Sequence, residues 1–205
     1  RISGERILAE ILKLTDPSSR WAFYADQIFI SIMKHNDLSL LDIESKLRCF
    51  EKTKSIEGLL VVDRIVIELL FLIGLEIDTV KKIQSRLKIG NDSKNWLLKC
   101  LDVKKISDEK SDFVSYCLLI DRSPDYLVTI NYFKAMGILD ENLFDQIVNT
   151  HKKFPASLIE ARDILGLVPA RTISKVLMEA REWQLRNAIV ERDLVINYII
   201  NKDQT

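Results

Sequence analysis

Residues 155–183, PASLIEARDILGLVPARTISKVLMEAREW, carry the pattern around which the rest of the chain is organised. Apolar residues recur at helical spacing over 156–165 and again from Ile173 onward, which predicts a helix, a tight turn and a second, longer helix. Gly166 follows the first helix, where a left-handed C-cap costs least. Pro169 lies at the start of the second, where its missing N–H is not needed. The stretch therefore predicts a helical hairpin.

The start of the second helix is a candidate site for an anion. Arg171, Thr172 and Lys175 lie in or beside its first turn, where backbone N–H groups lack partners inside the helix. Such an end can hold a nucleic-acid phosphate. An ordinary hairpin that closes a helical bundle explains the same spacing, so both interpretations stay open.

The whole chain reads as all-α, a bundle of about a dozen short to medium helices ending in the hairpin and a C-terminal helix. Its 205 residues are 47% hydrophobic, enough for a sizeable core, and only 6 Gly and 4 Pro are available for tight strand turns. Ser3 is the expected N-cap of the first helix, and 54–73 is the expected centre of the core. The expected helices cover 2–14, 19–34, 38–52, 54–73, 78–88, a segment capped by Asp92 or Ser93, 109–121, 123–136, 140–153, the two limbs of the hairpin, and 191–201.

Cysteine and histidine usage predicts neither a disulfide framework nor a metal site. His35 and His151 are far apart and have no ligand partners at metal spacing. The longest apolar run, 58–75, is interrupted by charged residues, which favours a buried helix over a membrane span. We therefore expect a cytoplasmic protein with no membrane partner and with reduced thiols at Cys49, Cys100 and Cys117.

Basic residues gather locally although the net charge is zero, with 30 Lys and Arg against 30 Asp and Glu. The segment 81–105 holds eight basic residues against two acidic ones. Such a cluster fits contacts to phosphates, and it is equally typical of a solvated helix face. The candidate phosphate-binding residues outside the hairpin are Lys81, Lys82, Arg86, Lys88, Lys94, Lys152 and Lys153.

The sequence contains none of the motifs that carry common catalytic chemistry. A phosphate-binding glycine loop, a zinc-protease HExxH helix and a GxSxG nucleophile turn are all missing. The acidic residues alternate singly with Lys and Arg, which is typical of solvated helix faces. We expect no catalytic residue and no bound cofactor in this chain, and no activity of the chain alone.

Three stretches, taken in order, resemble the class II tRNA nucleotidyltransferases and bacterial poly(A) polymerases. Residues 1–12, RISGERILAEIL, are similar to a motif at the junction of the neck and body of those enzymes, and 86–102, RLKIGNDSKNWLLKCLD, to a stretch in the body. The hairpin is similar to the family's tail, except that Ala161 and Ala170 stand where the family usually has Gly. The principal matching positions are Ser3, Glu5, Arg6, Glu10, Arg162, Asp163, Gly166 and Pro169.

The resemblance implies a role in gripping RNA. Residues 1–15 would end the neck, 16–153 would form the body and 154–205 the tail of a bacterial enzyme that adds CCA, part of it, or poly(A) to RNA. Its catalytic head, with Mg²⁺ and ATP or CTP, would lie upstream of Arg1. The implied partners are tRNA, held by its acceptor stem and elbow, and the chain's own head and neck; no reading of DNA sequence is implied.

The rival interpretation is a helical protein-interaction scaffold that makes no contact with RNA. A scaffold built as a helical solenoid would show a repeat period, and the sequence shows none. Arg6 and Glu10, spaced four residues apart, are expected to brace the junction of neck and body and not to touch RNA.

Overall fold

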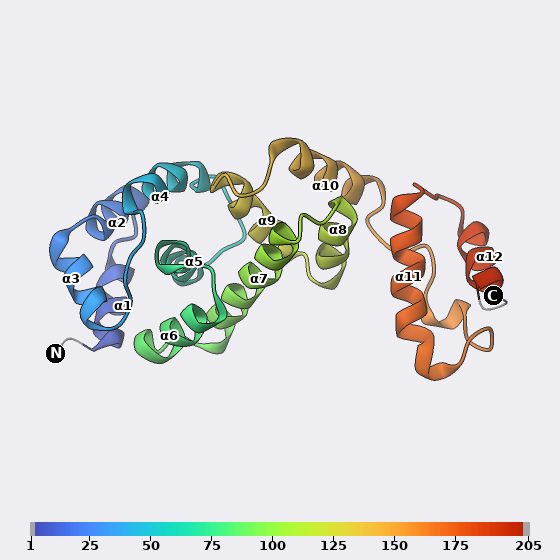
Figure 1. The fold of residues 1–205 in the computed structure, drawn as a ribbon, viewed down its shortest axis with the longest axis horizontal. Coiled ribbons are helices and arrows are strands. Elements are labelled where there is room, and N and C mark those ends of the chain that lie inside the picture. The colour runs from blue at the N-terminus through green and yellow to red at the C-terminus, as the bar shows by residue number, and fades with distance from the viewer. Residues whose placement is uncertain (1–2, 203–205) are drawn as a thin grey trace. The chain divides into compact units, whose positions relative to one another are not determined.

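The computed structural model describes residues 3–202, and within that range all regular elements are helical (Figure 1). The all-α prediction is therefore confirmed, and the chain ends in the helix pair α11 and α12. Residues 1–2, where the first helix was expected to begin, and 203–205, at the end of the expected tail, lie outside the described range. The twelve α-helices of the described part are α1 (Gly4–Lys13), α2 (Pro17–Tyr24), α3 (Gln27–His35), α4 (Ile43–Phe50), α5 (Val61–Ile73), α6 (Ile77–Leu87), α7 (Asn91–Asp108), α8 (Phe113–Arg122), α9 (Asp125–Ala135), α10 (Glu141–Lys153), α11 (Ile173–Arg186) and α12 (Arg192–Lys202).

The chain forms two compact units. The first consists of the described residues of Arg1–Lys110 together with Asp125–Asp140, and the second of Ser111–Pro124 together with the described residues of Glu141–Thr205. This division places α10 with the C-terminal residues, whereas 141–153 were expected to belong to the body. The neck, body and tail boundaries remain an expectation.

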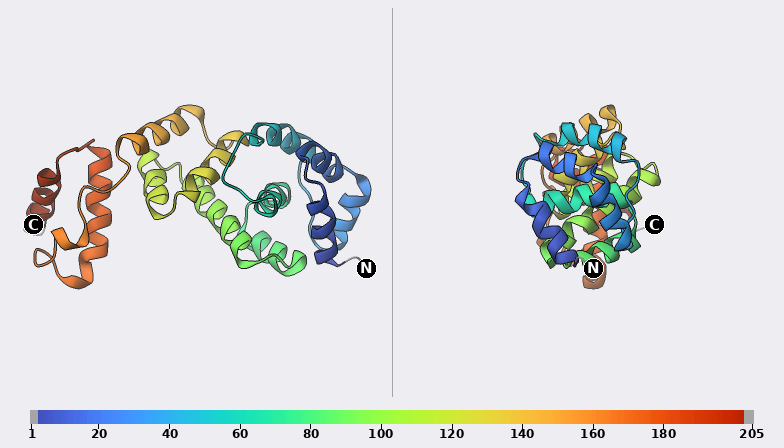
Figure 2. Two further views of the ribbon diagram at one scale, coloured as in Figure 1. Left: turned by 180° about the vertical axis from the view of Figure 1, so that it is seen from behind. Right: turned by 90° about the vertical axis from the view of Figure 1, so that its left-hand side faces the viewer.

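Helix α5 is the centre of the first unit, as the two opposite views of the ribbon show (Figures 1 and 2). Every residue from Ile65 to Ile73 is buried, and α1, α4, α6 and α7 pack around the helix. The prediction of the core centre is thus confirmed, although the helix begins at Val61 and not near 54. Just upstream of α5, Gly58 adopts a positive φ of 87°. Glycine accommodates this conformation easily because it has no Cβ atom.

Local capping explains two further departures from the expected helices. The predicted helix 19–34 is divided because the Asp26 carboxylate accepts hydrogen bonds from the backbone N–H groups of Ile28 and Phe29 and so caps a new helix. The helix α7 takes Gly90 as its N-cap, not Asp92 or Ser93. The Ser93 hydroxyl instead donates a 2.8 Å hydrogen bond to the buried carboxylate of Asp63 on α5.

The second unit has its own core between α11, α12 and the segment that precedes them. Helix α8 packs against both α10 and α11, and α11 packs along α12. The buried residues of the α11–α12 end of this unit are Ile159, Ile164, Val168, Ala180, Val195 and Ile199.

The first limb of the predicted hairpin is not an α-helix, which corrects the sequence analysis. Residues 156–165 are irregular apart from a 3-10 turn, Ala161–Asp163. The Asp163 carboxylate accepts a 2.8 Å hydrogen bond from the Glu160 backbone N–H and forms a 2.7 Å ion pair with Arg192 of α12. Such side-chain bonds to the backbone compete with helical hydrogen bonds. Ile159 and Ile164 still reach the core, whereas Leu165 is exposed, so the apolar pattern identified the core residues only in part and the predicted helical conformation was wrong.

The junction between the two limbs is also tighter than expected. Gly166, at φ 86°, forms a turn that brings Leu165 and Val168 together in a single bridge. Pro169 does not begin the long helix; it precedes a 3-10 turn, Ala170–Thr172, and α11 starts only at Ile173.

None of the helices in the described part is long and apolar enough to cross a membrane, α5 included. No group of three or more His, Cys, Asp or Glu side chains between residues 3 and 202 is placed to hold a metal ion.

The three cysteines, which are free thiols, should differ sharply in reactivity. Cys100 and Cys117 are buried, and burial raises the pKa of each thiol to about 12, whereas Cys49 is only half-buried. The thiolate is the reactive form. Titration of the native protein with a coloured thiol reagent at pH 8 should therefore modify Cys49 alone, and all three thiols should react in denaturant. Rapid reaction of two or more thiols in the native protein would contradict this packing.

Candidate RNA-binding surfaces

The first candidate surface lies on α6 and the start of α7, in the first unit. Helix α6 buries Val80, Ile83 and Leu87, because these residues recur at helical spacing on one face. The opposite face is thereby left to basic side chains. Four of the five predicted residues, Lys81, Lys82, Arg86 and Lys88, are exposed, and Lys94 is half-buried.

Two of these basic side chains already have acidic partners. Lys81 forms a 3.1 Å ion pair with Asp78, and Arg86 forms a 2.6 Å ion pair with Asp37. Because both pairs are exposed, each contributes little free energy and can exchange for a phosphate. Within residues 3–202, Lys82, Lys88 and Lys94 form no ion pair.

The end of α6 is fixed by a backbone contact with α1. Gly4 lies so close to α6 that a Cβ atom added to it would be 1.4 Å from the Arg86 carbonyl oxygen. Only glycine permits this approach. The contact links the segment that carries Ser3, Glu5, Arg6 and Glu10 to the basic surface.

The expected brace between Arg6 and Glu10 takes a different form. Ser3 caps α1 as predicted, by accepting a 3.4 Å hydrogen bond from the Arg6 backbone N–H. Glu10 forms its ion pair with Lys13, at 2.8 Å, and this hydrogen bond lowers the pKa of the Glu10 carboxyl. Glu5 and Arg6 are exposed.

The second candidate surface lies in the second unit, at the ends of α10 and α11. Lys152 and Lys153 are exposed at the last turn of α10, and the Lys153 ammonium lies 5.2 Å from the centre of the Phe154 ring. Arg171 is exposed in the 3-10 turn, and Lys175 is exposed on the first turn of α11. The pair Lys152 and Lys153 and the pair Arg171 and Lys175 therefore belong to different elements of the second unit. They do not lie on one face of a single helix.

Thr172 does not offer its hydroxyl to a ligand in the way the sequence suggested. The hydroxyl donates a 2.7 Å hydrogen bond to the Pro169 carbonyl and makes no capping bond to α11. Arg162 forms a 3.1 Å ion pair with Glu160. The motif residues Arg162 and Asp163 therefore mainly stabilise the segment 156–165 in which they lie.

An internal brace that the sequence analysis missed holds the segment after Lys153. Arg181 of α11 is 4% exposed and forms an ion pair with Asp121 of α8, with 2.7 Å between Nε and the carboxylate. Its other guanidinium nitrogens donate to the carbonyls of Phe154 and Ala156, at 2.6 and 2.7 Å. In the sequence, the only indication of this brace is that Arg181 is a charged residue among the apolar positions of an amphipathic helix.

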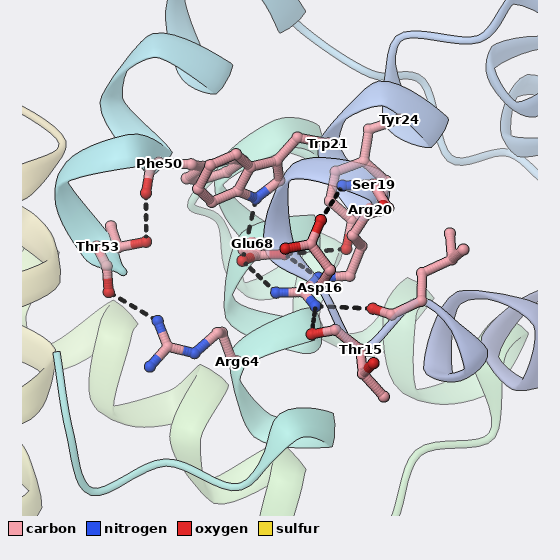
Figure 3. A network of polar contacts seen from close by, with 11 residues as sticks. Thr15, Asp16, Ser19, Arg20, Trp21, Tyr24, Phe50, Thr53, Arg64 and Glu68 are labelled. Carbon is pink, nitrogen blue, oxygen red and sulfur yellow. Dashed lines mark hydrogen bonds and ion pairs between the residues drawn. The ribbon is translucent and has the colours of Figure 1, made fainter. Parts of the chain in front are cut away.

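The first unit contains a second brace, a buried network around Glu68 of α5 (Figure 3). Arg20, Trp21 and Tyr24, all on α2, donate to its two carboxylate oxygens at distances of 3.0 to 3.3 Å. Arg20 and Glu68 are 1% and 0% exposed. Burial, together with the neighbouring carboxylate, holds the pKa of Tyr24 well above its usual range, so its hydroxyl remains a donor.

The same guanidinium ties the loop between α1 and α2 to this network. Arg20 also donates to the Leu14 carbonyl at 3.0 Å. One buried arginine therefore fixes α2, α5 and the end of α1 together. The sequence showed Glu68 inside an apolar run but gave no indication of its partners, which lie 44 to 48 residues away.

Two cavities open on the second unit. One, of about 480 Å³, lies beside Arg181 and is also lined by Asp121 and His151, whose Nδ1 is buried without a hydrogen-bond partner among the described residues. The charges of Arg181 and Asp121 cancel in their ion pair, so these two residues give the cavity no net charge. The other, of about 300 Å³, is a groove between α11 and α12 that includes Lys175.

Comparisons of the chain with protein-family models, with curated proteins and with solved structures find no match.

Proposed function

We propose that this chain binds structured RNA, and that it is the RNA-gripping body and tail of a tRNA nucleotidyltransferase or poly(A) polymerase. Its role would be to hold the acceptor stem and elbow of tRNA while a catalytic head, outside residues 1–205, adds nucleotides to the 3′ end. Mg²⁺ and ATP or CTP would bind that head. The reduced state of the three cysteines fits a cytoplasmic location.

The observation that carries this proposal is the exposed basic face of α6, presented by a helix whose other face is buried. A rigid helix can hold several cations at fixed spacing, which suits contacts with the phosphates of an RNA duplex. The resemblance of residues 1–12, 86–102 and 155–183 to the family adds a reason to choose tRNA as the partner. Because the net charge is zero, no long-range field assists binding, and modest affinity is expected.

The test is the salt dependence of binding to an unmodified tRNA transcript, measured by fluorescence anisotropy. Each phosphate contact adds roughly 0.7 to 0.9 to the slope of log affinity against log salt, so about four to six contacts give a slope near −3 to −5. Affinity should then fall by about 60- to 1,000-fold between 50 and 200 mM salt. Absence of binding at low salt would refute the proposal and favour the helical scaffold.

Charge reversal should locate the contacts. We expect Lys81→Glu/Lys82→Glu/Arg86→Glu to flatten the slope by about 2 to 3 and to weaken binding at low salt by about tenfold or more, because three phosphate contacts are lost. Arg171→Ala/Lys175→Ala should flatten it by about 1 to 2.

A matched control separates local contacts from net charge. Lys34→Glu/Arg48→Glu/Lys52→Glu alters the charge by the same amount at exposed positions on and after α3 and α4. This control should change the slope far less. If the α6 variant and the control weaken binding equally, the basic face of α6 is only solvated surface.

A further inference from the structure

The groove between α11 and α12 combines cationic and apolar groups in one small space. Its volume is about 300 Å³, at the lower end of the range of small-ligand sites. Val176 and Ile199 form part of an apolar wall, and Lys175 and Lys202 stand on its rim with Glu179. Such a lining suits a ligand with an anionic end and an apolar end.

Glu179 bridges the two lysines. One of its carboxylate oxygens lies 2.9 Å from the Lys202 ammonium, and the other lies 3.9 Å from the Lys175 ammonium. The hydrogen bond to Glu179 raises the pKa of Lys202, so this lysine is fully charged at neutral pH. The side chain of Glu179 is 30% exposed, and those of Lys175 and Lys202 are 73% and 49% exposed. Exposed pairs of this kind contribute little and can be displaced.

The aromatic ring of Tyr198 also lines the groove. Tyr198 stacks on Trp183 with ring centres 4.5 Å apart and planes 9° from parallel, so its orientation is fixed. The Lys202 ammonium lies 5.8 Å from the centre of the Tyr198 ring. A bare inorganic anion would use the lysines alone, whereas a nucleotide would also use the aromatic and aliphatic side chains.

We infer that this groove binds one nucleotide of the RNA, with its phosphate between Lys175 and Lys202, and that Glu179 is a built-in competitor that holds the two lysines until the phosphate displaces it. The inference rests on the proposed function and assigns part of the RNA contact to this groove. Glu179 places a carboxylate where the phosphate oxygens would lie, so it weakens RNA binding and discriminates against weakly anionic ligands.

The decisive variant is Glu179→Gln, which keeps the size of the side chain and removes its charge. Binding of the tRNA transcript should become about three- to tenfold tighter, because the lysines no longer have an internal anion. The salt slope should stay close to that of the wild type, because the number of phosphate contacts in the complex is the same in both proteins. Glu191→Gln makes the same charge change at an exposed position outside the groove and should alter affinity less than twofold.

Two further arms test the parts of the inference. In Glu179→Gln/Lys202→Gln the gain in affinity should disappear, because the cation that the substitution released is missing. Adenosine monophosphate should compete with the transcript for Glu179→Gln at a lower concentration than inorganic phosphate does. Equal competition by the two would overturn the nucleotide assignment.

The outcomes distinguish this inference from the proposed function. If wild-type protein binds no tRNA at any salt concentration, both fail. If it binds and Glu179→Gln gains no more than Glu191→Gln, the proposed function stands and the role of Glu179 is refuted.

Discussion

Replacing Arg20 with Met is expected to destabilise the first unit by about 3–5 kcal/mol, the usual cost of leaving one member of a buried ion pair without its partner. Glu68 would remain in the core with no cation, and its side chain has no access to water. The free energy of unfolding of a domain is only about 5–15 kcal/mol, so the loss is a large part of the total. Urea denaturation followed by circular dichroism and by tryptophan fluorescence measures it.

A second variant distinguishes the ion pair from simple packing. In Arg20→Met/Glu68→Gln both charges are removed, and the Gln carbonyl can still accept from Trp21 or Tyr24. We expect this double variant to recover more than half of the loss, because the unpaired buried charge is gone. Arg48→Met, an exposed substitution on α4, should change stability by no more than about 0.5 kcal/mol. A loss below 1 kcal/mol for Arg20→Met would show that Glu68 is not buried as described.

The helical class could be predicted because its determinants are local. Apolar spacing, the Ser3 cap and the glycines that follow α5 and α9 mark most helices to within a few residues. The segment 156–165 shows where this reasoning fails. Its apolar spacing suits a helix, but the hydrogen bonds of Asp163 with Glu160 and Arg192 depend partly on α12, which lies far away in the sequence.

The candidate surfaces were predictable only in part. The exposure of Lys81, Lys82 and Arg86 follows directly from the burial of the opposite face of α6. The acidic partners of these residues could not all be predicted in the same way, since Asp37, the partner of Arg86, lies 49 residues away in the sequence. Likewise the sequence identified Lys175 as a candidate phosphate-binding residue but did not indicate that Lys202 lies in the same groove. That arrangement depends on the packing of α12 along α11.

The contact between Gly4 and α6 gives the second large prediction. Intrinsic helix propensity favours Ala over Gly by up to about 1 kcal/mol, so on local grounds Gly4→Ala should stabilise α1. The packing in the structure reverses the expected sign of this stability change. The added methyl group would lie 1.4 Å from the Arg86 carbonyl oxygen and 2.4 Å from its carbonyl carbon, so the backbone of α1 or α6 must move.

We expect Gly4→Ala to destabilise the first unit by about 1–3 kcal/mol, the usual cost of forcing an extra carbon into a packed site. Gly90→Ala is the matched control, because a Cβ there meets no atom within 4 Å and φ is −69°. That substitution should cost no more than about 1 kcal/mol in the same urea titration, because Gly90 is the N-cap of α7 and Ala caps a helix less well than Gly. The shift of α6 should also move Arg86, so Gly4→Ala should weaken tRNA binding although no charge is removed. If Gly4→Ala is neutral or stabilising, α1 does not pack on the end of α6, and the link between the N-terminal motif and the basic surface is lost with it.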